Sequence, residues 1–193
     1  MSAETRDRII QAGNQAMLEK SYNGAGLNEI LKIAGVPKGS FYHHFASKED
    51  LGVCIVNQCA DEHTQRLRAF FSEPNKTPLE RLRSKFEWGR TYLIENGYTV
   101  ECLIFKLAME LATLSDPVRA SIRCAMDQWR SLTAQCIREA QHLGEIPEHH
   151  DPEALADFMI AAWEGVFLRV QVDREIRAAD DFLHFIFECL LAK

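Results

Sequence analysis

The sequence predicts an all-α fold, with a small N-terminal unit of three helices followed by a larger bundle of six. Two observations lead to this prediction. Apolar residues recur at intervals of three and four along the long segments, and no segment shows the pattern of a β-strand. The breaks between segments carry the signals that begin and end helices: a capping Ser, Thr or Asp, a proline in the first turn, or a glycine after the last turn.

The first three helices are separated by very short breaks. Residues 4–20 have the spacing of an amphipathic helix, and a second helix is expected from Leu27 to Ala34, where Gly35 supplies the left-handed residue that ends it. Pro37 then opens a third helix, because its missing N–H costs nothing there. Two helices joined so closely predict a helix-turn-helix, the motif that places its second helix in the major groove of DNA.

The third helix has one apolar and one polar face. Phe41 and Phe45 lie four residues apart and are expected in the core. The opposite face offers donors for phosphates and base edges, and its glycine permits close approach of the backbone. Ser47 and Asp50 form a capping box that places a lysine in the first turn of the next helix, beside the groove. The residues expected to contact DNA are Asn28, Pro37, Lys38, Gly39, Ser40, Tyr42, His43 and Lys48.

The run from Gly35 to Phe45, followed by Ser-Lys-Glu-x-Leu, resembles the TetR family of bacterial transcriptional repressors. The resemblance implies a homodimeric regulator that a small molecule releases from its operator. It also implies how the chain is divided: residues 1–50 form the helix-turn-helix DNA-binding domain, a helix at about 47–72 bridges, and residues 51–193 form a six-helix ligand-binding and dimerisation bundle.

Five helices are expected after the bridging helix. Their limits follow from caps and breakers: Thr77-Pro78 to Asn96-Gly97, about Val100 to Leu114, Asp116-Pro117 to Gly144, Asp151-Pro152 to Val170, and a last helix through Phe182 and Cys189. The second of these is apolar nearly all round, which predicts a buried central helix. The last two carry wide apolar stripes. These predict either a two-fold dimer on near-palindromic double-stranded operator DNA or the core of a single chain.

The bundle is expected to bind the small-molecule effector in a pocket lined mostly by apolar and aromatic side chains. Aromatic residues at helical spacing are more often plain core residues, and that interpretation stays open for each of them. The candidate effector-binding residues are Cys102, Trp88, Tyr92, Phe105, Met109, Trp129, Trp163 and Phe167.

Cys102 is the candidate for a sensing residue. The segments 101–107 and 162–165 resemble the branch of the family that contains the acrylate-responsive repressor and the repressor of N-ethylmaleimide reductase. This resemblance implies that Cys102 responds to electrophiles or oxidants, and a helix start would stabilise its thiolate. Gln171 stands where these relatives have a lysine, which argues against a Cys–Lys crosslink. The alternative is a non-covalent apolar or short-chain acid ligand, with Cys102 a bystander.

The other cysteines are scattered without close pairs, which favours reduced thiols in the core over disulfides or a zinc site. They are Cys54, Cys59, Cys124, Cys136 and Cys189. The histidines lack ligand spacing, so neither a metal nor another cofactor is expected.

The net charge of −6 lies outside the N-terminal segment, because residues 1–50 hold six basic and six acidic side chains. Non-specific attraction to phosphates should therefore be weak. No apolar run is long enough to span a membrane, which predicts a cytoplasmic protein without a membrane partner.

Two other classes of function are disfavoured. An enzyme with Cys102 as its nucleophile would need a nearby base, and no histidine lies between His63 and His142. A helical interaction module that had lost DNA binding would leave Tyr42 and Lys48 unexplained. The sequence therefore predicts a regulator and not an enzyme.

Overall fold

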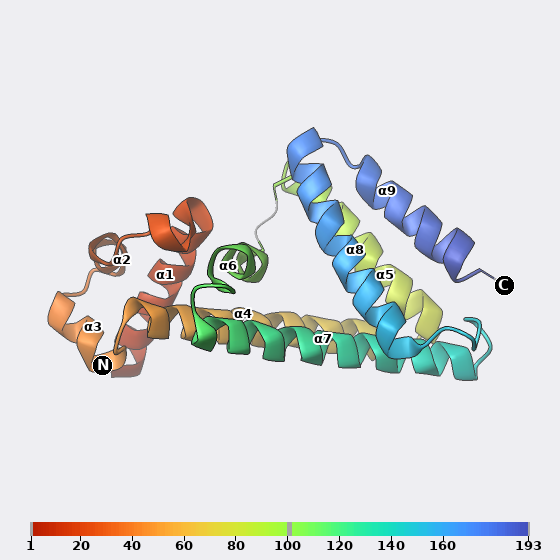
Figure 1. The fold of residues 1–193 in the computed structure, drawn as a ribbon, viewed down its shortest axis with the longest axis horizontal. Coiled ribbons are helices and arrows are strands. Elements are labelled where there is room, and N and C mark those ends of the chain that lie inside the picture. The colour runs from red at the N-terminus through yellow and green to blue at the C-terminus, as the bar shows by residue number, and fades with distance from the viewer. Residues whose placement is uncertain (1, 100–101, 193) are drawn as a thin grey trace. The chain divides into compact units, whose positions relative to one another are not determined.

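The computed structural model describes residues 2–99 and 102–192, and these residues form helices and no strand (Figure 1). The predicted all-α class is confirmed. In the described part of the chain the elements are α1 Ser2–Gly24, α2 Leu27–Ala34, α3 Lys38–His44, α4 Lys48–Phe71, α5 Pro78–Glu95, α6 Leu103–Leu111, α7 Asp116–His142, α8 Pro152–Asp173, α9 Arg177–His184, and a closing π-helix, Phe185–Leu190. None of these helices is both long enough and apolar enough to cross a lipid bilayer.

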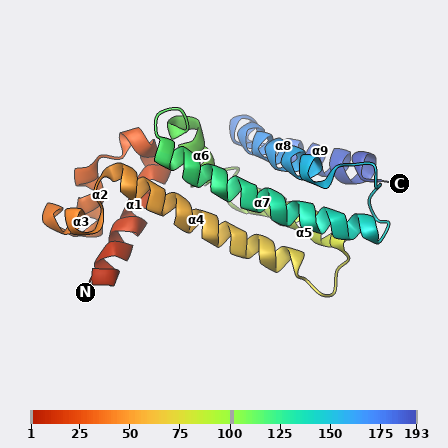
Figure 2. The same cartoon turned by 60° about the horizontal axis from the view of Figure 1, so that its bottom comes forward.

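The chain forms two compact units. One comprises Met1–His63 and Glu101–Ala125, and the other comprises Thr64–Val100 and Met126–Lys193. Helices α4 and α7 contribute to both units, and within each unit a part of α4 lies beside a part of α7 (Figure 2). In the first unit the Ser121 hydroxyl donates to the Asn57 side-chain oxygen, and in the second the Trp129 Nε1 donates to Thr64 Oγ1 at 3.1 Å.

The helix-turn-helix of the first unit is built as the sequence predicts. Gly35 ends α2 in the left-handed conformation, with φ of 63°, and the Arg8 guanidinium of α1 donates to its carbonyl oxygen at 3.2 Å. Pro37 is the extended N-cap of α3, one position before the place expected for it. Phe41 and Phe45 are buried, which confirms the predicted core face of α3.

Helix α6 differs from the expected buried helix. It ends at Leu111, and Met109 is 76% exposed and Leu114 73% exposed within its unit. Only one stripe of the helix is apolar and buried, because Lys106 and Glu110 turn towards polar backbone groups of α1. The expected start near Val100 lies outside the described residues.

Helices α5, α8 and α9 pack around an aromatic core in the second unit (Figure 1). The Phe86 ring centroid lies 5.2 Å from that of Trp163 and 4.8 Å from that of Phe182. At Gly89 the Trp163 indole of α8 packs directly on α5, since an added Cβ would lie 2.7 Å from Trp163 Cζ2. The predicted capping box of α5 is present, with the Thr77 side chain accepting from the backbone N–H at the third helical position.

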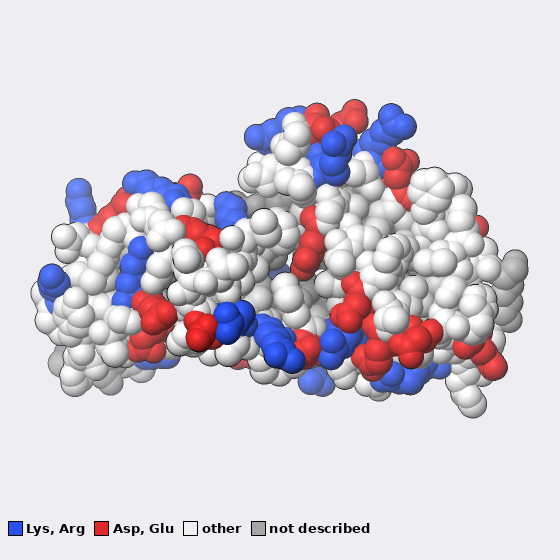
Figure 3. Space-filling view, viewed as in Figure 1, with Lys and Arg blue, Asp and Glu red and all other residues white. Residues whose placement is uncertain are grey.

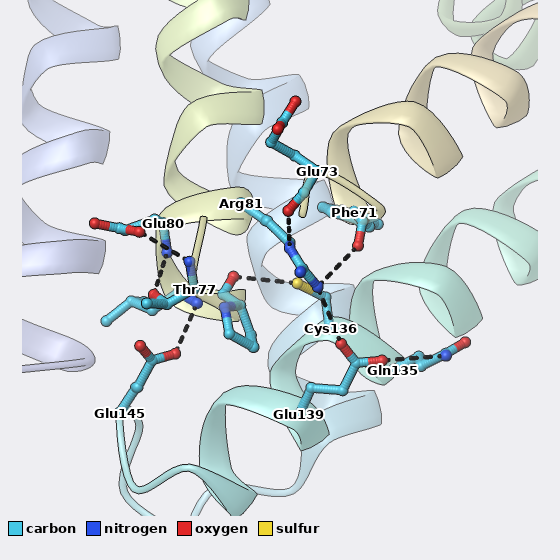
Figure 4. A network of polar contacts seen from close by, with 11 residues as sticks. Phe71, Glu73, Thr77, Glu80, Arg81, Gln135, Cys136, Glu139 and Glu145 are labelled. Atoms are coloured by element: carbon cyan, nitrogen blue, oxygen red, sulfur yellow. Dashed lines mark hydrogen bonds and ion pairs between the residues drawn. The ribbon is translucent and has the colours of Figure 1, made fainter. Parts of the chain in front are cut away.

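A polar network joins the start of α5 to the end of α7 (Figure 4). Arg81 Nε donates to the Glu73 carbonyl oxygen at 2.7 Å, and its guanidinium pairs with Glu139 at 3.5 Å. Beside it, the Cys136 thiol lies 3.2 Å from the Pro78 carbonyl oxygen, and burial raises the pKa of Cys136 to about 12. Cys136 is therefore the inert core thiol that the sequence predicts.

Candidate nucleic-acid interface and effector site

Helix α3 presents a polar face to solvent. Lys38, Tyr42 and His43 are exposed, with Tyr42 53% exposed although its neighbour Phe41 is fully buried. The Lys38 ammonium lies 6.0 Å from the centroid of the Tyr42 ring. Ser40 is half-buried. The helix can therefore offer a cation, a phenol and an imidazole to a groove without disturbing its packed face.

Three further predicted contacts lie in the first unit. Asn28, Pro37 and Gly39 are all exposed. An added Cβ at Gly39 would meet no atom within 4 Å, so the protein's own packing does not require glycine there. A glycine that the packing does not need leaves room for a partner to approach the backbone.

Lys48 lies where it was predicted in the sequence but is already engaged inside the first unit. Its Nζ donates to the Tyr22 carbonyl oxygen at 2.5 Å and lies 4.2 Å from the centroid of the Tyr22 ring. Burial lowers the pKa of Lys48. This lysine therefore supports the junction between α1 and α4, and its phosphate contact stays a prediction.

The charges of the face shown in Figure 3 are mixed. Lys and Arg atoms are interspersed with Asp and Glu atoms on this face, without a broad basic patch. This distribution agrees with the balanced charge of residues 1–50 and favours a few placed contacts over general attraction to phosphates.

The start of α6 carries Cys102. This residue is the N-cap of the helix and is half-buried. One turn later, Lys106 Nζ donates to the carbonyl oxygen of Leu18 in α1 at 2.6 Å. The other two candidates on α6 differ from each other, because Phe105 is half-buried and Met109 is exposed.

Glu110, near the end of α6, binds a break in α1. Ser21 has φ of 65° and ψ of 173° inside that helix, a conformation that residues other than glycine rarely adopt. The Glu110 carboxylate accepts hydrogen bonds from the backbone N–H groups of Tyr22 at 2.8 Å and Asn23 at 2.7 Å, and from the Ser21 hydroxyl at 3.3 Å. These bonds satisfy donors that the break removes from the helix. No pattern in the sequence indicates this contact, because it joins residues nearly ninety positions apart.

Two family models match the chain in order. "Bacterial regulatory proteins, tetR family" matches residues 9–52, and "Tetracyclin repressor-like, C-terminal domain" matches residues 78–186. The chain belongs to the TetR family. Its N-terminal helices are the family's helix-turn-helix, and the predicted family is confirmed.

Named relatives agree with this assignment to TetR. The chain is 35% identical over 186 residues to the HTH-type transcriptional repressor DhaR of Mycobacterium sp. (strain GP1), covering 96% of this chain and 92% of that protein. It is 37% identical over 165 residues to the transcriptional regulator AcuR of Cereibacter sphaeroides, covering 86% and 75%. The crystal structure of the reduced form of E. coli NemR matches with a TM-score of 0.87 at 26% identity, covering 98% of each chain.

The remaining effector candidates of this TetR chain lie in the second unit. Trp88 is exposed and stacks on Tyr92, with ring centroids 5.5 Å apart. Trp163 is buried and meets the half-buried Phe167 edge to face at 5.8 Å. Trp129 is buried and donates to Thr64, as described above. The structure thus forms one aromatic pair on α5 and another on α8. Trp129 instead makes a hydrogen bond that supports the packing of its helix.

An open groove of about 710 Å³ lies beside the network of Figure 4. None of the predicted effector residues lines it. Its lining consists of Pro74, Asn75, Lys76, Thr77, Pro78, Arg81, Arg138, Glu139, His142 and Leu143.

The second unit also holds an ionisable pair that the sequence interpretation missed. Lys85 is half-buried on α5, and its Nζ lies 3.8 Å from the centroid of the Phe86 ring and 5.6 Å from that of Trp163. Glu164 on α8 is half-buried, and its charge acts on Lys85. The sequence shows only a lysine next to an apolar position of α5. A solvated lysine at the edge of a helix face would produce the same pattern.

The predicted core position of the five other cysteines is wrong for two of them. Cys124 and Cys189 are exposed, because each lies beside and not within the buried stripe of its helix. Cys54 and Cys59 are half-buried and accept hydrogen bonds from Arg6 and Asn14. Within the described residues, no three His, Cys, Asp or Glu side chains gather as metal ligands would.

Proposed function

We propose that this TetR-family chain is a homodimeric repressor that binds near-palindromic double-stranded operator DNA and releases it when an electrophile or oxidant modifies Cys102. Residues 1–50 supply the DNA contacts, and residues 51–193 supply effector binding and dimerisation. The observation that carries the proposal is the place of Cys102: it occupies the N-cap position of α6, the helix that holds the broken end of α1 through Lys106 and Glu110.

DNA recognition rests on the two faces of α3. Phe41 and Phe45 fix the helix in the core, so Lys38, Tyr42 and His43 are held in one orientation towards the major groove. Lysine contacts phosphates as a point charge, whereas the phenol and imidazole can also bond to base edges. One such helix offers few contacts, and a two-fold dimer doubles them on a site with matching symmetry.

In this proposal the dimer surface is formed by α8, α9 and the π-helix that follows α9. Four large apolar side chains there are each more than half exposed in the single chain: Phe158, Leu168, Val172 and Phe185. Burial of apolar area of this kind is the main favourable term in subunit association.

The thiol of Cys102 would act by addition. Its sulfur forms a bond to one carbon of an activated C=C group, and the thiol proton ends on the neighbouring carbon. A new substituent at the N-cap changes the first turn of α6, and that change reaches α1 through Lys106 and Glu110. The helix-turn-helix is affected because Arg8 of α1 also holds the end of α2.

The test is fluorescence anisotropy with labelled DNA from upstream of the protein's own gene. N-ethylmaleimide should lower the affinity of the wild type at least about tenfold and leave Cys102→Ser unchanged. Cys124→Ser is the matched control, because it removes an exposed thiol and should respond like the wild type.

Two results would count against the proposal. Tight binding that N-ethylmaleimide does not change would remove the role of Cys102 and favour a non-covalent apolar or short-chain acid ligand. An absence of binding to any upstream fragment would overturn operator recognition itself.

A further inference from the structure

The open groove of about 710 Å³ in the second unit has no part in the function proposed above. Its volume lies in the range of small-molecule sites, which combine apolar surface with a few polar groups. Pro74 and Leu143 supply apolar surface to its lining, and both are exposed, Leu143 to 63%. The groove therefore leaves apolar surface in water that a ligand could cover.

The walls of the groove are held in place by the protein's own hydrogen bonds. The Arg81 guanidinium donates to the carbonyl oxygens of Phe71 at 3.3 Å and Glu73 at 2.7 Å, which fixes the segment between α4 and α5. The Leu79 N–H donates to the Glu145 carboxylate at 3.0 Å, which joins the first turn of α5 to the segment after α7. A groove that is formed in advance costs a ligand less ordering on entry.

The charges of the lining favour an anion. Lys76, Arg81 and Arg138 all line the groove, whereas Glu139 is the only carboxylate among the described residues of its lining. Arg81 already pairs with Glu139 at 3.5 Å. The excess of positive charge is a local feature, because the net charge of the whole protein is −6.

The two remaining cations differ in how far their charges are compensated. Arg138 pairs with Glu153 at 2.9 Å. The Lys76 ammonium donates to a neutral group, Ser84 Oγ, at 2.7 Å, and no carboxylate of the described residues forms an ion pair with it. Lys76 is also exposed, so an anion in solution can reach it. A carboxylate that entered the groove would gain a charge-assisted hydrogen bond from this ammonium.

We propose that the groove binds a free amphipathic carboxylate, whose head pairs with Lys76 and whose short aliphatic chain lies along Pro74 and Leu143. Both halves of such a ligand are needed. An inorganic anion would leave the apolar surface in water, and a neutral alcohol would leave the charge of Lys76 without a partner. No covalent bond is made or broken, so this site is independent of the chemistry proposed for Cys102.

The affinity is tested by isothermal titration calorimetry on the full-length protein, with octanoate as the probe. Octanoate should bind at least about fivefold more tightly than 1-octanol or acetate, because each of these lacks one half of the recognised chemistry. Lys76→Met should weaken octanoate binding about threefold, whereas Lys76→Arg keeps the charge and should bind like the wild type. Arg177→Met is the matched control and should leave the affinity unchanged, because it removes an exposed cation of the same unit that does not line the groove.

The place of the bound ligand is tested by photo-crosslinking. An octanoate analogue with a diazirine on its chain is irradiated with the protein, and the product is digested and mapped by mass spectrometry. The label should fall on lining residues such as His142 and Leu143, and an excess of octanoate should remove it.

Several results would overturn the proposal. An absence of octanoate binding, or equal affinity for octanoate and 1-octanol, would show that the groove does not recognise a carboxylate. Equal losses in Lys76→Met and Arg177→Met would indicate general attraction to surface cations. Crosslinks confined to residues outside the lining would place the ligand elsewhere. These measurements use no DNA, so a failure of operator binding would overturn the earlier proposal and leave this one to its own test.

Discussion

Helices α3 and α6 are both short helices of the first unit, but they direct their polar side chains oppositely. In α3 the residues Lys38, Tyr42 and His43 point to solvent, and Phe41 points inwards. In α6, Lys106 and Glu110 bond to the backbone of α1, and an apolar residue, Met109, is left exposed. A polar residue on a short helix can therefore serve as an external contact or as an internal support. Substitutions of both kinds of side chain would test this distinction.

The largest effect is expected where α3 enters the core. Phe41→Ala should lower the free energy of unfolding by about 3–5 kcal/mol, because the ring is fully buried and contacts Phe45. Urea denaturation measures this. Tyr42→Ala, one position along, should cost less than about 0.5 kcal/mol. Equal costs at the two positions would show that the faces of α3 are assigned wrongly.

Glu110→Ala tests the internal role of α6. It should lower the free energy of unfolding by about 2 kcal/mol, because two backbone N–H groups lose a charged acceptor. Amide hydrogen exchange at Tyr22 and Asn23 should also become faster. Glu62→Ala, which removes an exposed carboxylate of α4, is the control and should change neither quantity. Unchanged exchange at both amides would contradict the assigned contact.

Lys85→Met tests a charged side chain that turns inwards without a backbone acceptor. The folded pKa of about 7 lies below the ordinary value of 10.5, so between these limits the unfolded chain binds a proton that the folded chain does not. Wild-type stability contributed by this residue therefore rises with pH across that window. The variant should be more stable than the wild type by about 2 kcal/mol at pH 7, allowing for partial exposure. Thermal unfolding should show the gain shrinking towards pH 10; a gain that did not vary with pH would contradict the shift.

Tyr42→Ala tests the external role of α3. Operator affinity should fall about tenfold, roughly 1–2 kcal/mol, because the variant loses an exposed side chain that we propose enters the groove. Met109→Ala removes the exposed apolar residue of α6 and should leave affinity unchanged. Anisotropy measures both, and a loss of affinity in the second variant alone would reverse the comparison.

The smallest expected effect is a difference in salt dependence between two lysines that are predicted to lie beside the DNA groove. Lys38→Met should lessen the salt dependence of operator binding by about one phosphate contact, because its ammonium is exposed. Lys48→Met should lessen it by less, since the Tyr22 carbonyl already holds that ammonium. Affinities measured over a series of salt concentrations give the slopes. Equal slopes for the two variants would restore Lys48 as a full phosphate contact.

The features that the sequence predicted correctly depend on residues that lie close together along the chain. Gly35 at the end of α2 and the capping box at Thr77 depend on residues within one helical turn, and the burial of Phe41 and Phe45 follows from their spacing. From these features the sequence predicted the position of α3, the candidate DNA-recognition helix, and most of its exposed residues.

What the sequence could not supply depends on distant partners. The break at Ser21 is held by Glu110, and the setting of Lys85 is made by Trp163 and Glu164 from another helix. The apolar pattern of α6 also predicted more burial than the structure shows. Such a pattern counts apolar residues and does not show which neighbour covers them. Helix assignment is local, whereas the role of a polar side chain is not.

The contact of the Trp163 indole with Gly89 has a consequence for the evolution of the sequence. Gly89 and the Trp163 indole occupy one volume between them, and a methyl group at position 89 would need 2.7 Å contact with the indole. Neither position can vary alone without a clash or a void. Among relatives the two should covary, glycine with tryptophan and a larger residue with a smaller partner.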